Sequence, residues 1–185
     1  MIDEQSLFKH LPGLEGQLGV EHLKPLLDRI MVRKLESGEV LVRDQAPLDA
    51  FYLVLSGCLR LAVEFGDHAI HLGEVGAGNW VGEVAFFSGT GLSSTTVTAC
   101  GDTELARLSF QDFDTLLDED SVAVCRLTHG FIQMLMRRLS VTANNPIIDP
   151  QGEMLLPGDL TVPMSELTQG PHGVVDFLKS LLGVH

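Results

Sequence analysis

The most constraining feature of this sequence is a series of short apolar segments, separated by turn residues, between positions 36 and 109. Segments such as FYLVL, LRLAV and TELARLSF are rich in Val, Leu and Phe, and Gly, Pro or Asp residues interrupt them at short intervals. Strands this short, with no long helix between them, predict an antiparallel β-roll or jelly-roll barrel. Within this roll, Gly101-Asp102 predicts a tight hairpin between the last two strands.

Helical periodicity occurs on both sides of the predicted roll. Residues 20–35 place apolar side chains three and four positions apart, which predicts one leading helix. Residues 110–117 predict a brief helix after the roll. A longer helix, capped by Asp118 or Ser121, is expected to follow and to run to about Thr142. The fold class is therefore mainly β with flanking helices.

A change in composition divides the chain into three expected parts. Residues 1–118 form the roll with its leading helix, residues 119–143 form the long helix, and residues 144–185 form an acidic tail that holds five of the eight prolines. The Asn-Asn-Pro sequence at 144–146 is expected to end the long helix. Helical spacing between residues 174 and 182 predicts a short amphipathic helix near the end of the tail.

The charge balance disfavours some classes of partner. The 185 residues include 12 Lys and Arg against 25 Asp and Glu, which gives a formal net charge of −13. Such a surface repels nucleic acid and anionic membranes. No apolar stretch has the length of a membrane span or a signal peptide. Three cysteines without a CxxC pair are typical of a reducing compartment. We therefore expect a cytoplasmic protein that binds neither DNA nor membrane.

Two segments, GEVLVRDQAPLDAFYLVLSGCLRLAV and GAGNWVGEVAFFSGTGLSSTTVTA, resemble the cyclic nucleotide-binding domain. This β-roll occurs in the catabolite activator protein, in cyclic nucleotide-dependent kinases and in gated channels. The order of elements agrees over about residues 1–143, and MRRLSVTANN resembles the catabolite activator version of the long helix. The resemblance implies a non-enzymatic regulatory module with cyclic AMP or cyclic GMP as the candidate ligand. Residues 144–185 do not resemble the helix-turn-helix domain of the transcription factors in this family.

The resemblance also implies which residues contact a ligand. The family's phosphate cassette is a Gly-Glu pair, an apolar run, a glycine loop and an Arg followed by a small hydroxyl residue. Backbone amides and the Arg hold the cyclic phosphate, while the Glu accepts from the ribose. The matching positions here are Gly82, Glu83, Val84, Ala85, Ser93 and Ser94, with Arg138 and Thr142 on the long helix near the base. Residues 83–87 are expected to form one short helical turn.

The family's Arg is replaced in this sequence by Leu92, and Gln45 and Leu48 stand where the family has glycines in a turn. Without the guanidinium group of this Arg, which would pair with the cyclic phosphate, we expect weak, altered or no cyclic nucleotide binding. Two interpretations stay open. Either the pocket accepts a less charged ligand, as a sensor that signals to an effector protein, or it is filled by the protein's own side chains. In the second case the chain is a ligand-free interaction or scaffold module, with the tail helix over the pocket.

The long helix carries an apolar strip wider than one face. Met134, Leu135, Met136 and Leu139 contribute to this strip, which predicts a homodimer with paired long helices and with Phe131 in the seam between them.

The segment HAIHLGE contains two His and one Glu, which are common metal ligands, and so suggests a metal site. On one regular strand, however, His68 and Glu74 face one side and His71 the other, so three ligands do not converge. The cysteines are expected to be small buried hydrophobes rather than zinc ligands. The sequence has neither a GxSxG elbow nor a Walker phosphate loop, so no metal site and no catalytic residue is predicted.

Overall fold

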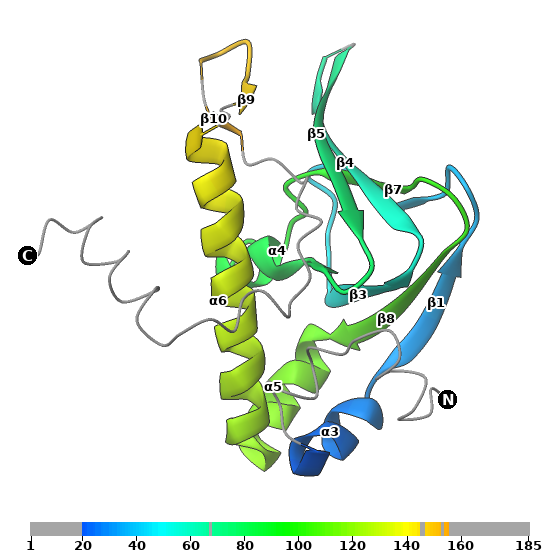
Figure 1. The fold of residues 1–185 in the computed structure, drawn as a ribbon, viewed down its shortest axis with the longest axis vertical. Helices are drawn as coiled ribbons and strands as arrows, with labels where there is room; N and C mark the ends of the chain where they lie inside the picture. The colour runs from blue at the N-terminus through cyan, green and yellow to red at the C-terminus, as the bar shows by residue number, and fades with distance from the viewer. Residues whose placement is uncertain (1–19, 67, 145–146, 153, 156–185) are drawn as a thin grey trace, which may run out of the picture.

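The strands form two four-stranded antiparallel sheets that close into a roll (Figure 1). The computed structural model describes residues 20–66, 68–144, 147–152 and 154–155. The first sheet has the order β1-β8-β3-β6 and the second β2-β7-β4-β5, while β9 and β10 form a separate small hairpin. The strands are β1 (Met31–Leu35), β2 (Val40–Val42), β3 (Ala50–Ser56), β4 (Cys58–Phe65), β5 (His68–Gly76), β6 (Trp80–Val81), β7 (Thr96–Ala99), β8 (Thr103–Ser109), β9 (Ile147–Ile148) and β10 (Met154–Leu155). The predicted β-roll is confirmed.

Within the described residues, four helices lie at one side and one end of the roll. They are α3 (Val20–Leu27), α4 (Glu83–Phe87), α5 (Phe110–Glu119) and α6 (Ser121–Asn144). Figure 1 shows α6 standing alongside the roll, with α4 between them and α3 and α5 near the end where α6 begins. No helix in the described ranges is both long enough and apolar enough to cross a membrane.

Strand β3 explains why the domain has two hydrophobic cores. Its side chains alternate in direction, and all but the last are buried. Tyr52 and Val54 pack into the core between the two sheets, whereas Phe51 and Leu53 pack into a second core between the first sheet and the helices. This strand is therefore covered on both faces, and it fixes the roll against α6.

The leading helix is shorter than the periodicity of residues 20–35 predicts. Helix α3 ends at Leu27, and Met31–Leu35 instead pair with β8 as strand β1. Leu35 is 2 % exposed in the core between the sheets, while Met31 is 58 % exposed. Pairing with β8 gives these residues a hydrogen-bond ladder on one side of the strand and buries Leu35. The helical spacing alone could not reveal this advantage.

The predicted hairpin at Gly101-Asp102 is wrong. Strand β7 pairs with β2 and β4, whereas β8 pairs with β1 and β3, so the two strands lie in different sheets. The connection crosses from one sheet to the other and packs against Gly57. A Cβ at Gly57 would lie 2.6 Å from the Asp102 carbonyl oxygen, so only glycine fits there. The chain bends at residues 100–102, and this bend joins the two sheets rather than two neighbouring strands.

Helix α6 begins after Asp120, whose Oδ1 accepts from the Ala123 amide at 3.1 Å. The N-terminal cap is thus Asp120 rather than Asp118 or Ser121. The helix ends at Asn144, as the Asn-Asn-Pro sequence predicts. Phe131 is 1 % exposed, and its ring stacks on Phe51 at a centroid distance of 5.0 Å. Phe131 is therefore a core residue of the domain, and the prediction that places it in a dimer seam is wrong.

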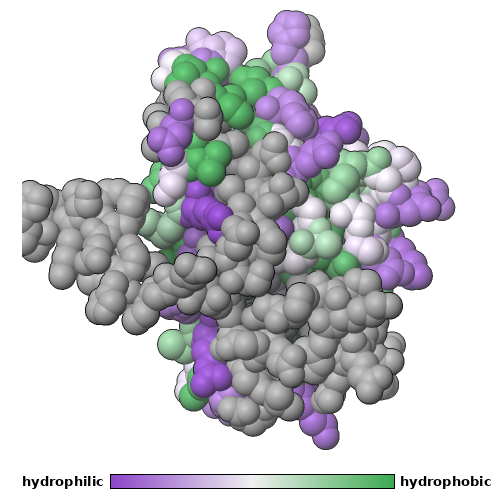
Figure 2. All heavy atoms as spheres, in the orientation of Figure 1, coloured by the Kyte–Doolittle hydropathy of each residue, from purple (hydrophilic) through white to green (hydrophobic). Residues whose placement is uncertain are grey.

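The visible surface in Figure 2 mixes apolar and polar residues, with apolar side chains gathered near the end of α6 and the β9–β10 hairpin. The amphipathic segment predicted at 174–182, and most of the predicted tail, lie outside the described residues.

Candidate functional site

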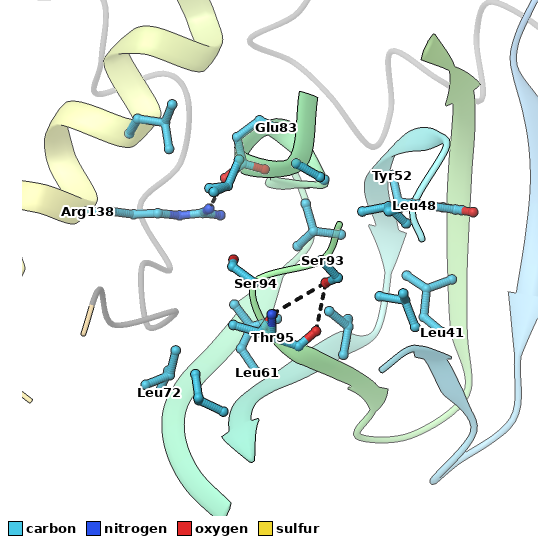
Figure 3. Close-up of a pocket in the computed structure, with 18 residues that line it drawn as sticks. Leu41, Leu48, Tyr52, Leu61, Leu72, Glu83, Ser93, Ser94, Thr95 and Arg138 are labelled. Carbon is cyan, nitrogen blue, oxygen red and sulfur yellow. Dashed lines mark hydrogen bonds and ion pairs between the residues drawn. The ribbon is translucent and has the colours of Figure 1, made fainter. Parts of the chain in front are cut away.

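A cavity of about 260 Å³ opens within the roll, next to α4 and α6 (Figure 3). Its wall is mostly aliphatic and comes from the second sheet and the adjoining strands. The aliphatic lining residues are Leu41, Val42, Leu48, Leu61, Val63, Leu72, Val81, Val84, Ala85, Val97 and Leu135. The polar groups are concentrated at the α4 and α6 side, where Glu83 and Arg138 lie, and on the loop of Ser93, Ser94 and Thr95.

Gly82 and Glu83 begin the short helix α4 at the cavity wall. Gly82 has a φ of 101°, and a Cβ at this position would lie 2.5 Å from the Ala50 carbonyl oxygen. Only glycine meets both conditions. The turn at Gly82 directs Glu83 inward, where its side chain is 1 % exposed. The predicted short helical turn at 83–87 is confirmed.

Glu83 is paired with Arg138 of α6. Arg138 donates from Nη1 to Glu83 Oε1 and from Nη2 to the Trp80 carbonyl at 2.8 Å. The exposed fractions of the two side chains are 7 % for Arg138 and 1 % for Glu83, so both charges are desolvated. Glu83 Oε2 is buried and has no hydrogen-bond partner among the described residues. One acceptor atom of the cavity is therefore still available for a donor.

The loop that precedes β7 closes the other side of the cavity. Ser93 is buried, its hydroxyl donates to the Thr95 carbonyl at 2.7 Å, and its backbone carbonyl accepts from the Gln45 amide at 2.8 Å. Gln45 has a φ of 58°, a left-handed conformation that favours glycine. This backbone demand accounts for the glycine that the family has there, and Gln45 meets it with an L side chain.

Seven of the nine predicted ligand residues line this cavity: Gly82, Glu83, Val84, Ala85, Ser93, Ser94 and Arg138. Leu92 is not among the lining residues. Its side chain is 37 % exposed and its backbone forms a bridge with Pro47, while the next residue, Ser93, takes the inward position. Thr142 lies in α6, but its side chain is outside the described part of the chain. The ligand roles of all nine residues stay predictions.

The cavity holds little positive charge. Among the described lining residues, Arg138 is the only Lys, Arg or His, and it already faces Glu83. The loop of Leu92, Ser93 and Ser94 offers hydroxyl groups but no cation. An anionic phosphate at this loop would therefore lack the charge-assisted hydrogen bonds from an Arg guanidinium that stabilise phosphates in proteins.

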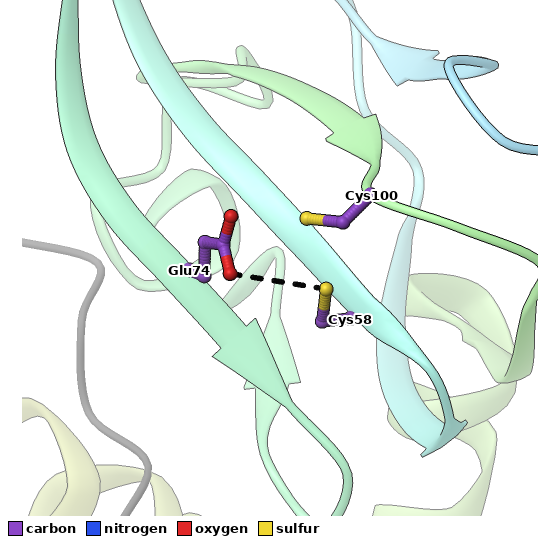
Figure 4. Close-up of side chains that lie close together, drawn as sticks. All are labelled: Cys58, Glu74 and Cys100. Carbon is purple, nitrogen blue, oxygen red and sulfur yellow. Dashed lines mark hydrogen bonds between the residues drawn. The ribbon is translucent and has the colours of Figure 1, made fainter.

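The cysteines differ from the prediction of buried hydrophobes. Cys125 is exposed, and Cys58 and Cys100 are half-buried. The Sγ atoms of Cys58 and Cys100 and a carboxylate oxygen of Glu74 all lie within 4.8 Å of one another (Figure 4). The two cysteines are 42 positions apart in sequence, so only the strand pairing could reveal this cluster.

The comparisons with known proteins agree with this fold. Residues 32–120 match the family model of the cyclic nucleotide-binding domain. This part of the chain belongs to that family. Among curated proteins, the neuropathy target esterase sws of Drosophila virilis is 34 % identical over 118 residues, which cover 61 % of this chain and 8 % of that protein. The chain thus corresponds to less than a tenth of the length of this curated relative.

Solved structures extend the likeness. The catabolite activator protein of Thermus thermophilus has a TM-score of 0.60 at 26 % identity, over 71 % of this chain and 60 % of that chain. A cyclic nucleotide-binding domain from Methylobacillus flagellatus has a TM-score of 0.66 at 19 % identity, over 74 % and 80 %.

A third solved structure contains a bound cyclic nucleotide. It is the regulatory subunit of a cAMP-independent protein kinase A from Trypanosoma brucei, with a TM-score of 0.55 at 25 % identity, over 68 % of this chain and 44 % of that chain. That structure is a triple variant bound to cAMP, and one of its three changes replaces a threonine by arginine.

Proposed function

We propose that this chain is a non-enzymatic regulatory module in which the cavity binds a small molecule but binds cyclic AMP or cyclic GMP weakly or not at all. The buried pair of Glu83 and Arg138 carries this proposal, because Arg138 already engages one oxygen of the carboxylate that the family resemblance assigns to the ribose, and within the described part of the chain only Oε2 stays open to a donor. The aliphatic wall and the absence of a cation on the described loop support a ligand with less charge than a cyclic phosphate.

The same pair gives the module a route for a signal. Glu83 belongs to the cassette helix α4, whereas Arg138 belongs to α6. A ligand with a donor for Glu83 competes with Arg138 for the same carboxylate, so occupancy of the cavity changes the contact that holds α6 against the roll. The proposed output is a shift of α6 that an effector protein detects.

The long helix also supports a homodimer. Its exposed or half-buried residues away from the core follow the alternating spacing of three and four that characterises a coiled-coil seam. These seam residues are Val122, Cys125, His129, Ile132, Met136 and Leu139. Because the core face of α6 uses different residues, pairing with a second copy would leave the domain intact.

The alternative is a ligand-free interaction or scaffold module. The same buried ion pair supports this function if it is permanent, since the protein would then satisfy the pocket by itself. The match to neuropathy target esterase covers 8 % of that protein, so it does not carry an esterase activity over to this chain. A cytoplasmic setting, in which Cys58 and Cys100 stay reduced, is part of both versions of the proposal.

Isothermal titration calorimetry of the purified chain with cyclic AMP and cyclic GMP tests the nucleotide part. We expect no saturable heat at micromolar nucleotide for either compound. Thermal-shift screening of neutral, largely apolar molecules that carry a hydroxyl or amide donor tests the ligand part. We expect a binder whose effect is lost in Leu135→Trp, which fills the cavity, and is retained in Leu117→Trp, an exposed control position outside it.

Submicromolar binding of either nucleotide would contradict the nucleotide part of the proposal. If no compound shifts the melting temperature and the Leu135→Trp variant is as stable as the native chain, the scaffold function replaces the sensor function.

A further inference from the structure

Three neighbouring segments of the second sheet place two thiols and a carboxylate together. Cys58 begins β4, Glu74 lies in β5, and Cys100 directly follows β7 (Figure 4). The Cys100 amide donates to the Cys58 carbonyl at 3.0 Å, so the two cysteines face each other across the β4–β7 pair. Their neighbours Leu59 and Ala99 are buried in the core between the sheets. Because side chains alternate along a strand, the cysteines point to the outer face.

The same register brings Glu74 to this outer face. Glu74 pairs with Arg60 in the β4–β5 ladder, two residues from Cys58, so it lies on the same side of the sheet as Cys58. Its Oε2 lies 4.0 Å from Cys58 Sγ, and its Oε1 lies 3.3 Å from Arg60 Nη2. A tetrahedral zinc ion with typical bond lengths needs sulfur and oxygen ligands roughly 3.5 Å apart. Small side-chain rotations therefore convert this cluster into a coordination site.

We propose that Cys58, Cys100 and Glu74 form a binding site for Zn²⁺. Two thiolates and one carboxylate are ligands that this ion prefers, and three protein ligands leave a fourth position for water. Binding displaces the two thiol protons to solvent, and no electron is transferred.

The charges around the site balance. Two thiolates and a carboxylate sum to −3, Zn²⁺ reduces this to −1, and the guanidinium of Arg60 offsets the remainder. Arg60 also donates to Glu74 Oε1, the carboxylate oxygen that does not face Cys58. Residues that hydrogen-bond a metal ligand in this way commonly orient it toward the ion. All three ligand side chains are half-buried, so an ion can reach them from solvent.

The backbone at the site is held in place before any ion binds. The Cys58 carbonyl accepts from the Cys100 amide and also from Thr103 Oγ1 at 3.1 Å. On the other side, Ser37 Oγ donates to the Cys100 carbonyl at 3.4 Å. Ligands on ordered strands lose little entropy when they bind a metal, which favours a site of this kind over one on a loop.

The test uses the full, untagged chain, reduced and freed of metal. Zn²⁺ is titrated in competition with a chromophoric chelator, and Co²⁺ serves as the spectroscopic probe. We expect one equivalent of Zn²⁺ per chain, together with a thiolate-to-cobalt charge-transfer band that histidine ligation would not produce. Cys58→Ser and Cys100→Ser should abolish the band, and Glu74→Gln should weaken zinc binding by roughly tenfold or more, because it replaces a charged ligand.

Cys125→Ser is the matched control, because Cys125 is exposed and lies on α6 away from the cluster. This variant should keep both the stoichiometry and the cobalt band. Circular dichroism of each metal-free variant separates lost ligands from lost folding, and Glu74→Gln supplies a second readout if a serine variant unfolds. The proposal is overturned by absence of the band in the native chain, by loss of the band in Cys125→Ser, or by a Cys58–Cys100 disulfide in protein from a reducing cytoplasm.

Discussion

Glu83 and Arg138 form a buried ion pair although they are 55 positions apart in the sequence. Glu83 is the first residue of the cassette helix α4, and Arg138 projects from the long helix α6. The pair therefore joins the roll to α6 at the wall of the cavity.

Removal of one member of this pair should destabilise the domain strongly. Arg138→Met leaves a carboxylate in a desolvated site without its cation, at a cost of about 3–5 kcal/mol in the free energy of unfolding. The double variant Glu83→Gln with Arg138→Met should recover part of this loss, because no unpaired charge remains. Urea unfolding followed by circular dichroism measures both effects.

The control for this pair is Lys34→Met. Lys34 forms an exposed ion pair with Glu104, and water already screens such pairs, so this variant should leave the unfolding midpoint unchanged. An Arg138→Met variant that is as stable as the control would show that the Glu83–Arg138 contact does not hold α6.

Sequence patterns predicted those features that depend on neighbouring residues. Alternation located the strands, and the glycine before Glu83 located the cassette helix, because both signals are local. The contacts of Glu83 with Arg138 and of Cys58 with Cys100 depend on sheet and helix packing between distant segments, and no spacing rule encodes them. The same reason explains the errors at residues 31–35 and at Gly101-Asp102, where a distant strand decided the pairing.

The junction of α5 and α6 should weaken in acid. The hydrogen bond from His22, together with the amide of Ala123, lowers the pKa of Asp120 below its usual value. A carboxylate with a lowered pKa in the folded state stabilises the fold above its ordinary pKa of about 3.9, and this contribution is lost as the pH falls through the lowered value. Asp120→Asn keeps a helix-capping side chain but removes the charge.

Thermal melts of both proteins over a range of pH measure this effect. The Asp120→Asn variant should melt below the native chain at neutral pH, and the two curves should converge in strong acid. Asp114→Asn, at an exposed position of α5, should follow the native chain throughout. A constant gap between Asp120→Asn and the native chain at every pH would contradict the assignment to this charge.

Pairing of α6 with a second copy should depend on the seam residues rather than on Phe131. Ile132 is 43 % exposed at the centre of the seam, so Ile132→Asp should convert a dimer of about twice 20.1 kDa into a monomer while the fold stays intact. Light scattering measures the mass. Leu117→Asp, at an exposed apolar position of α5 outside the seam, should leave the dimer in place. The expectation fails if the native chain is itself monomeric at high concentration.

Introducing an arginine at position 92, where the family resemblance predicts one, tests the proposed cassette most directly. Leu92 is 37 % exposed and directly precedes the lining residues Ser93 and Ser94, so Leu92→Arg adds a long cation beside the cavity without burying it in the core. A charge-assisted pair with the cyclic phosphate contributes about 1.5–3 kcal/mol, which corresponds to a roughly ten- to 150-fold gain in cyclic AMP affinity.

Two companion variants decide how the gain arises. Glu83→Gln in the Leu92→Arg background should lose most of it, because the ribose hydroxyls then lack their carboxylate acceptor. Ser93→Arg should instead lower the melting temperature, since Ser93 is 4 % exposed and a guanidinium there lies unpaired in the loop. Calorimetry and thermal melts on all three variants give the answer. Tighter binding of cyclic AMP in Ser93→Arg but not in Leu92→Arg would show that position 93, not position 92, corresponds to the family's phosphate-binding Arg. No gain in affinity in either variant would favour a pocket that is filled by the protein's own side chains.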